Sequence, residues 1–275
     1  MSKLLIVTLI ILFSSIYPPI YCQDYYEMGY KEYFYGDNNK SIEYFTQAIK
    51  NNQNILFSYI YRGAAYGFSG NFFKSLEDLN AAKQLDSTEY KVYYYFGKMY
   101  LFNGINGKAL NYFNKSISLN SKDADVFDQR AGAKVQLSDY RGAIEDENIA
   151  IQLNDSNYNY YNTKGYAEFM LNNYEEAIVD YNKSLSIRPT HKAYANRGYA
   201  YATIGNSLKA IDDYSLALKI FPEDYQILYL RGLAYKKLNK NDLACNDFKK
   251  SAELGYSLAS KELTNFCGLS DIKSE

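Results

Sequence analysis

The chain has 275 residues, a formal net charge of −1, 47% hydrophobic residues and 22% charged residues. This composition excludes a wholly disordered chain, and the near-zero charge provides no electrostatic footprint for nucleic acid or an anionic membrane surface. The 4 Pro and 16 Gly residues also exclude collagen-like and low-complexity chains.

The N-terminal segment has the order of features found in a secretory signal peptide. A short start containing Lys3 precedes the apolar run 4–13, and helix-breaking prolines follow. A membrane-spanning helix needs ~20 apolar residues, about twice this length. We therefore predict a signal peptide over residues 1–22 and a mature chain in the periplasm, the cell envelope or the medium, with no membrane span. The alternatives are a retained membrane anchor and a lipidated Cys22.

The rest of the sequence repeats with a period of 34 residues, in one case 33. Small residues recur at this spacing inside Tyr-rich stretches, which indicates an array of structural repeats. The anchoring residues are Gly29, Gly63, Gly97, Ala131, Gly165, Gly198 and Gly232. The predicted units, which together fill 23–258 of the mature chain, are 22–55, 56–89, 90–123, 124–157, 158–190, 191–224 and 225–258.

Each unit has the pattern of a helical hairpin. Apolar and small residues follow helical spacing at unit positions 4, 8 and 11, and again at positions 20, 24 and 27. Turn-forming pairs lie between the two stripes, at Gly36-Asp37, Gly70-Asn71 and Gly205-Asn206. A single hairpin cannot bury its apolar face, so the units are expected to stack into a solenoid.

This pattern resembles the tetratricopeptide repeat (TPR) family, in its small residues at positions 8, 20 and 27, its aromatic residues at 4, 11 and 24, and its proline at 32. Units 191–224 and 225–258 are the most similar, and Pro222 holds the proline position. The resemblance implies an all-α fold, a right-handed superhelical solenoid of seven antiparallel helix hairpins. A C-terminal capping helix over 257–267 would follow, so that residues 259–275 hold the end of the cap and a short tail.

No catalytic or metal-binding pattern is recognisable. The single histidine, His191, opens a unit, and a lone histidine at a surface is more often solvated than catalytic. Phosphate-binding loops, nucleophile elbows and zinc-ligand spacings are not found in the sequence. We therefore predict no enzymatic activity, no cofactor and no metal site.

The resemblance also implies that the first helix of each unit lines a concave groove through unit positions 2, 5, 9 and 12. Tyrosine combines a flat apolar face with a hydroxyl and is enriched at protein interfaces. Codon bias is an alternative explanation for the 32 Tyr residues. The residues predicted to line the groove are Tyr26, Tyr30, Tyr94, Lys98, Asn162, Tyr166, Tyr199 and Tyr229.

A groove of this kind predicts a non-enzymatic protein–protein interaction scaffold that binds a protein or peptide partner outside the cytoplasm. The alternative is an envelope assembly or structural subunit that uses its convex or end surfaces. Some TPR proteins bind chaperone termini through a basic clamp, but here Lys192 and Asn196 match that clamp only at isolated positions. Nucleic acid is not an expected partner.

Unit positions 7 and 23 change together along the chain. Five units have a basic residue at position 7 and an aspartate at position 23, whereas the other two have Met28 and Phe96 at position 7 and tyrosine at position 23. We predict structural ion pairs that set the register of each hairpin. The pairs are Arg62–Asp78, Arg130–Asp146, Lys164–Asp180, Arg197–Asp213 and Arg231–Asp247.

Unit 124–157 departs from the repeat. Lys134 and Glu147 occupy positions 11 and 24, which are usually aromatic, and Glu168 occupies position 11 of the next unit. Half-buried charges need partners, so we expect these three to compensate one another. The alternative is a polar patch or a flexible point within the solenoid.

Two cysteines of the mature chain lie on either side of the last predicted turn. Cys245 precedes Gly255 by ten residues and Cys267 follows it by twelve. Antiparallel helices that rise about 1.5 Å per residue would bring both to nearly the same level. We predict a disulfide that ties the cap to the last repeat, with two buried thiols as the alternative.

Overall fold

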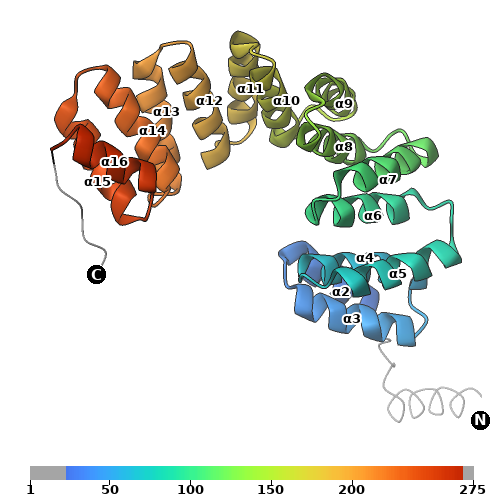
Figure 1. Ribbon diagram of the computed structural model, residues 1–275. Coiled ribbons are helices and arrows are strands. Elements are labelled where there is room, and N and C mark those ends of the chain that lie inside the picture. The colour runs from blue at the N-terminus through green and yellow to red at the C-terminus, as the bar shows by residue number, and fades with distance from the viewer. Residues whose placement is uncertain (1–22, 269–275) are drawn as a thin grey trace, which may run out of the picture. The chain divides into compact units, whose positions relative to one another are not determined.

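The computed structural model describes residues 23–268 of the chain (Figure 1). The predicted signal peptide, Cys22 and the tail over 269–275 lie outside the described residues. Within 23–268 every regular element is an α-helix, and none of these helices is long and apolar enough to cross a membrane. The predicted all-α fold class is confirmed.

The helices follow one another in pairs along the chain, and one further helix ends the array. Each pair falls in one predicted unit, except that α4 begins one residue early. The pairs are α2 (Tyr25–Tyr35) and α3 (Asn38–Lys50), α4 (Ile55–Phe68) and α5 (Phe72–Leu85), α6 (Tyr90–Phe102) and α7 (Asn106–Leu119), α8 (Ala124–Gln136) and α9 (Tyr140–Leu153), α10 (Tyr158–Met170) and α11 (Tyr174–Ile187), α12 (His191–Thr203) and α13 (Ser207–Ile220), and α14 (Tyr225–Lys237) and α15 (Asn241–Glu253), followed by α16 (Ser257–Asn265).

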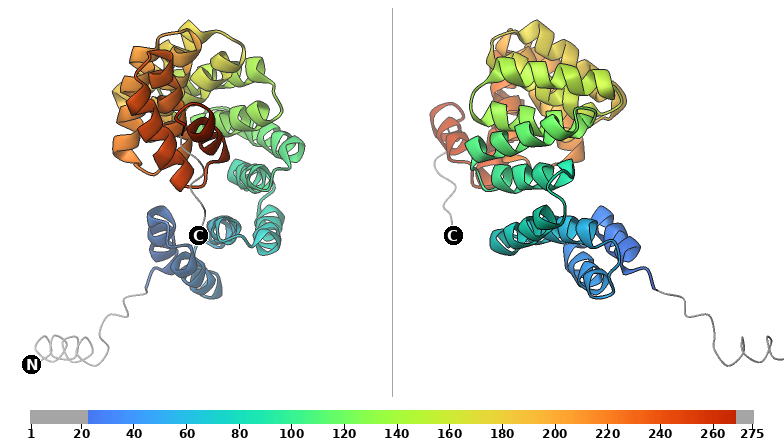
Figure 2. Two further views of the ribbon diagram at one scale, coloured as in Figure 1. Left: turned by 60° about the vertical axis from the view of Figure 1, so that its left-hand side comes forward. Right: turned by 90° about the vertical axis from the view of Figure 1, so that its right-hand side faces the viewer.

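The chain divides into two compact units, one up to Met99 and one from Tyr100 onward. In the first unit, α2 packs on α3 and α4, α3 packs on α4, and α4 packs on α5. In the second unit each helix from α7 to α16 packs on the next, and the pairs follow one another along a curved row (Figure 1) that Figure 2 shows from two further directions. The first helices also contact one another, α8 with α10, α10 with α12 and α12 with α14, so they line one side of this row.

The predicted turns place a glycine and a capping residue between the two helices of a pair. Gly36 has a φ of 86°, and the side chain of Asp37 accepts a hydrogen bond of 3.1 Å from the backbone N–H of Lys40. Gly205 has a φ of 85°, and Asn206 caps α13 in the same way. Glycine adopts this left-handed conformation without a steric penalty, and the cap satisfies an otherwise unpaired helix donor. These turns are confirmed.

A ring from the second helix packs against a glycine of the first helix in several pairs. A Cβ atom at Gly198 would lie 2.9 Å from the Tyr214 ring, and one at Gly232 would lie 2.6 Å from the Phe248 ring. A larger residue at either position would have to displace the ring, so glycine at unit position 8 makes room for the ring in these pairs. The pair α8 and α9 differs at both positions, with the buried residues Ala131 and Glu147.

The last helix, α16, covers the end of the second unit. It packs on α15, and its Leu263 is buried in a cluster with Phe248. The amine of Lys236 forms an ion pair of 2.7 Å with Glu262. Cys245 of α15 and Cys267 after α16 form a disulfide with their Cα atoms 5.8 Å apart. The cap therefore has an apolar, an ionic and a covalent attachment to the last pair.

Replacing Cys245 and Cys267 by serine is expected to loosen the cap and to lower the free energy of unfolding by about 3 kcal/mol. The disulfide closes a loop with a sequence separation of 22 residues, and its loss restores the loop entropy of the unfolded chain. Hydrogen exchange should show the greatest increase in α15 and α16, with α8 and α9 as the internal control. Unchanged protection of α16 would contradict a stabilising role.

Candidate functional site

The groove residues predicted in the first compact unit form an aromatic cluster. The rings of Tyr26 and Tyr30 stack at 6.3 Å, and Tyr30 meets Tyr61 edge-on at 5.0 Å. The amine of Lys98 lies 5.3 Å from the centre of the Tyr94 ring. Burial is the main cause that raises the pKa of Tyr61 to about 12, so its hydroxyl stays neutral. These side chains lie on first helices, as expected, and they also contact one another.

The groove residues predicted in the second compact unit, from Tyr100 onward, lie in three different places. Asn162 and Tyr166 border one hollow, and Tyr199 borders another. Tyr229 borders neither of these hollows, because its ring packs 5.8 Å from Phe248 and 5.2 Å from Tyr256. Tyr229 is half-buried on the first helix α14, so its place in the groove stays a prediction.

The first hollow, the amide pocket, has a volume of about 250 Å³ and lies among the first helices α8, α10 and α12. The Nδ2 of Asn196 donates a hydrogen bond of 3.3 Å to the Oδ1 of the buried Asn162. Successive pairs therefore present amide groups and the exposed Tyr166 and Lys192 to one space. The lining residues are Gly132, Val135, Gln136, Asn162, Thr163, Tyr166, Lys192 and Asn196.

Sequence reasoning found only part of the amide pocket. Lys192 and Asn196 matched a clamp pattern at isolated positions, and Gln136 and Thr163 carried no signal of their own. The positions of Thr163 and Asn196 within their units are equivalent, so a comparison of all polar residues on the first helices would have found this row. Which of them share one hollow depends on the packing of three consecutive pairs.

A buried carboxyl lies between the same helix pairs. Glu147 is 0% exposed, and the side chains of Asp128 and Thr163 are its polar neighbours. Burial, and then the negative charge of Asp128, raise the pKa of Glu147 to about 10. The carboxyl is therefore neutral near pH 7, and its proton is available for a hydrogen bond to Asp128. Thr163, which borders the amide pocket, is the polar neighbour on α10.

The expected compensation among Lys134, Glu147 and Glu168 is wrong. The amine of Lys134 pairs with Asp146 at 2.9 Å and donates to the carbonyl of Gly142 at 3.0 Å. Glu168 accepts a hydrogen bond from Asn173 instead. Because Lys134 reaches the neighbouring aspartate, Glu147 is left without a positive partner and avoids the penalty of a buried charge by protonation.

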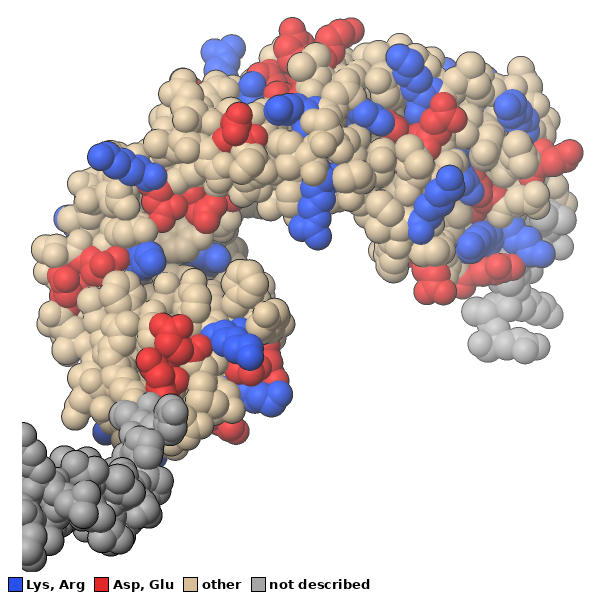
Figure 3. Space-filling model, turned by 180° about the vertical axis from the view of Figure 1, so that it is seen from behind, with Lys and Arg blue, Asp and Glu red and all other residues tan. Residues whose placement is uncertain are grey.

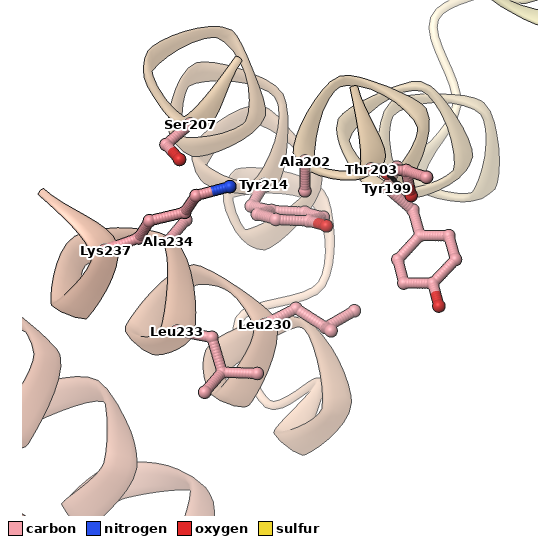
Figure 4. A pocket seen from close by; sticks show the side chains of 9 residues that line it. All are labelled: Tyr199, Ala202, Thr203, Ser207, Tyr214, Leu230, Leu233, Ala234 and Lys237. Carbon is pink, nitrogen blue, oxygen red and sulfur yellow. Dashed lines mark hydrogen bonds between the residues drawn. The ribbon is translucent and has the colours of Figure 1, made fainter. Parts of the chain in front are cut away.

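The second hollow, the Tyr214 pocket, also has a volume of about 250 Å³ and lies among α12, α13 and α14. Figure 4 shows the Tyr214 ring of α13 facing Leu230 and Leu233 of α14, with the Lys237 side chain of α14 reaching one end of the ring. In this view the Tyr214 hydroxyl and the Lys237 amine lie near opposite ends of the tyrosine ring. The lining residues are Tyr199, Ala202, Thr203, Ser207, Tyr214, Leu230, Leu233, Ala234 and Lys237.

All five predicted ion pairs are in contact, and four of them use two hydrogen bonds. Arg197 donates to both carboxylate oxygens of Asp213 at 2.8 and 2.6 Å. The same arginine also donates to the side chain of Asn182 on the preceding second helix, at 2.6 Å. The corresponding third partners of Arg62, Arg130 and Arg231 are Thr46, Asn114 and Ser215. Each arginine therefore links its own hairpin to the preceding one, a role that the sequence did not reveal.

The remaining charged residues are mixed in sign. On the face that Figure 3 shows, basic and acidic side chains lie next to one another over the described helices. His191 lies 3.0 Å from Asp224, with its ring edge-on to Phe221. Within residues 23–268 no three His, Cys, Asp or Glu side chains come together in a way that could hold a metal ion.

Comparisons with known proteins identify the repeats. Family models described as tetratricopeptide repeat match residues 158–191, 191–224 and 225–254. A search of curated proteins finds no match to the chain.

Several solved structures share the fold. A tetratricopeptide repeat protein from Parabacteroides merdae ATCC 43184 is 20% identical, with 88% of this chain and 97% of that chain covered and a TM-score of 0.63. PilF of Pseudomonas aeruginosa is 17% identical, with 76% and 96% covered and a TM-score of 0.69. YrrB, another TPR protein, is 23% identical, with 67% and 95% covered and a TM-score of 0.53. Residues 158–254 are therefore tetratricopeptide repeats, and the solved structures share the fold over a larger part of the chain.

Proposed function

We propose that this protein is a non-enzymatic protein–protein interaction scaffold whose groove binds a protein or peptide partner outside the cytoplasm. The observation that carries the proposal is the amide pocket, where α8, α10 and α12 present polar side chains to one hollow. The binding surface is the row of first helices in the second compact unit, which contact one another along one side.

The chemistry of the amide pocket suits an extended peptide. Each amide side chain offers both a donor and an acceptor, which is what the backbone of a peptide requires. The exposed ring of Tyr166 adds an apolar face, and Lys192 adds a positive charge at the rim. YrrB, which has the same fold, is described as a TPR protein with an unusual peptide-binding site.

Two features support a location outside the cytoplasm. The first is the predicted signal peptide over residues 1–22. The second is the disulfide between Cys245 and Cys267, because disulfides persist mainly in oxidising compartments. Cell fractionation with an antibody against the mature chain tests the location directly.

A photo-crosslinker in the groove tests the proposed binding surface. Benzoylphenylalanine in place of Tyr166 should capture a partner in the native envelope, whereas the same group in place of Val179 on α11 should not. Alanine at Tyr166 should lower the amount of partner retained by about 5- to 30-fold, the usual effect of removing an interface hot spot. Circular dichroism should show unchanged helix content in both variants. Equal capture from both positions would contradict the groove.

One observation favours the alternative, an assembly subunit. In the first compact unit Phe34 and Phe73 are 77% and 80% exposed, and Tyr35 is similarly exposed beside Phe34. Exposed aromatic residues of this size are typical of contact surfaces. If this reading is correct, light scattering will show an oligomer that alanine at Phe34 and Phe73 dissociates, while alanine at Tyr166 has no effect.

A further inference from the structure

The Tyr214 pocket contains a buried hydroxyl without a partner. Tyr214 is 0% exposed, and no described residue forms a hydrogen bond with its hydroxyl oxygen. A buried polar group in this state is unfavourable, and native structures avoid it. The same position in other pairs holds Phe45, Phe113 and Phe248. Packing at this position therefore does not require a hydroxyl, and the oxygen of Tyr214 is free to serve a ligand.

The pocket also contains a positive charge without a counter-ion. Lys237 is exposed at the end of α14, and none of the ion pairs within residues 23–268 includes it. Leu230, Leu233 and Ala234 add apolar lining to the pocket, and the Tyr214 ring lies between this amine and the tyrosine hydroxyl. The pocket thus offers an apolar hollow, one neutral donor and one cation.

We propose that the Tyr214 pocket receives one large apolar side chain of an extended peptide that carries an acidic residue next to it. The apolar side chain packs on Leu230 and Leu233, the Tyr214 hydroxyl donates to a peptide carbonyl, and Lys237 pairs with the acidic side chain. This inference rests on the proposed function, because it names a specificity site within the same row of first helices.

The size and polarity of the pocket decide this class of ligand. Its volume of about 250 Å³ lies below the range of about 300–1,000 Å³ that is common for small-molecule sites. A single side chain of a longer ligand therefore fits better than an independent metabolite. Charge complementarity with the unpaired Lys237 selects an acidic neighbour over a basic one.

A phage-displayed library of random dodecapeptides, selected on the mature chain, tests the proposal. The expected enriched sequences have a large apolar residue next to Asp or Glu. For a synthetic peptide of the enriched sequence, Tyr214→Phe should weaken binding by about 2- to 12-fold, the range for one hydrogen bond. In the free protein the same substitution should raise the Tm by about 2 °C or more, because it removes the unpaired hydroxyl.

Matched variants separate this site from the rest of the groove. Tyr181→Phe makes the same change in the preceding pair. The Tyr181 hydroxyl is not among the buried groups that lack a hydrogen-bond partner, so this substitution should alter neither the peptide affinity nor the Tm. Lys237→Glu should shift the selection from acidic to basic neighbours. If the selected peptides bind Tyr214→Phe and Lys237→Glu as tightly as they bind the unsubstituted protein, the assignment of the Tyr214 pocket is overturned, while peptide binding in the groove is still supported. The absence of any enriched peptide would overturn both.

The tail over 269–275, which lies outside the described residues, contains one sequence of the expected kind, Asp271-Ile272. A protein that ends at Gly268 distinguishes this occupant from an external one. Unchanged affinity for the selected peptide supports an external ligand. An increase of about tenfold or more would show that the tail competes for the pocket, and it would overturn the assignment to a partner.

Discussion

Replacing Asp213 by alanine is expected to lower the free energy of unfolding by about 3–5 kcal/mol, one of the two largest effects that we predict. Asp213 is 3% exposed and accepts two hydrogen bonds from Arg197. Its removal leaves a guanidinium in a largely buried place without its negative partner, which is costlier than the loss of the pair as a whole. Urea denaturation followed by circular dichroism measures the change.

The chain supplies the matched control for this prediction. One unit has Met28 and Tyr44 in place of the basic and acidic residues. Arg197→Met combined with Asp213→Tyr copies this natural solution and should recover most of the stability lost in Asp213→Ala, because both charges are removed together. If Asp213→Ala lowers the free energy of unfolding by less than about 1 kcal/mol, the prediction is contradicted, because an effect this small is typical of a solvent-exposed ion pair.

The ion pairs show which part of the structure a single repetitive sequence can reveal. Arg197 and Asp213 recur in register with four other pairs, so their contact could be inferred from the way the two positions change together. The further hydrogen-bond partner of each arginine could not be inferred, because this residue differs in type from unit to unit: it is Thr46, Asn114 or Ser215. A contact that several residue types can make leaves no fixed pattern in the sequence.

The groove was less predictable than the fold. Helical spacing and turn residues placed each helix, because these signals are local. The ring contacts of Tyr229 with Tyr256 and Phe248 join residues 27 and 19 positions further along the chain, so no local signal indicates them. The two hollows likewise depend on which side chains meet across three helices. Repeat position therefore indicates which face a residue lies on, and packing decides whether a ligand can reach it.

The pair α8 and α9 shows that a departure from the repeat can carry structural information. A ring at position 24 packs closely on glycine at position 8, as with Tyr214 and Gly198. Ala131 and Glu147 differ from this pattern together, since no ring lies at position 24 and position 8 carries a Cβ atom. The sequence therefore contained the signal that Glu147 occupies the place of a core ring. The charge state of Glu147 follows only from its neighbours in the structure.

The stability of the protein is expected to fall as pH rises, because folding holds a proton on Glu147. The pKa of this carboxyl is about 10 in the folded protein, against 4.5 for an unperturbed glutamate. Below about pH 4.5 both states are protonated, and this contribution to stability is fully present. Between the two values the unfolded chain loses the proton and the folded chain keeps it, so stability falls by up to about 1.4 kcal/mol per pH unit. Above the folded pKa the contribution is lost.

Glu147→Gln isolates this effect, because the amide is similar in shape to the neutral acid and can still donate to Asp128 but does not titrate. The variant should lie close to the parent near pH 5 and exceed its free energy of unfolding by about 4 kcal/mol at pH 8. Glu145→Gln, on the exposed side of the same helix, should follow the parent at both values. Urea titrations at a series of pH values measure the difference. If Glu147→Gln follows the parent at every pH, the folded protein holds Glu147 as a carboxylate, and a positive partner must reach it after all.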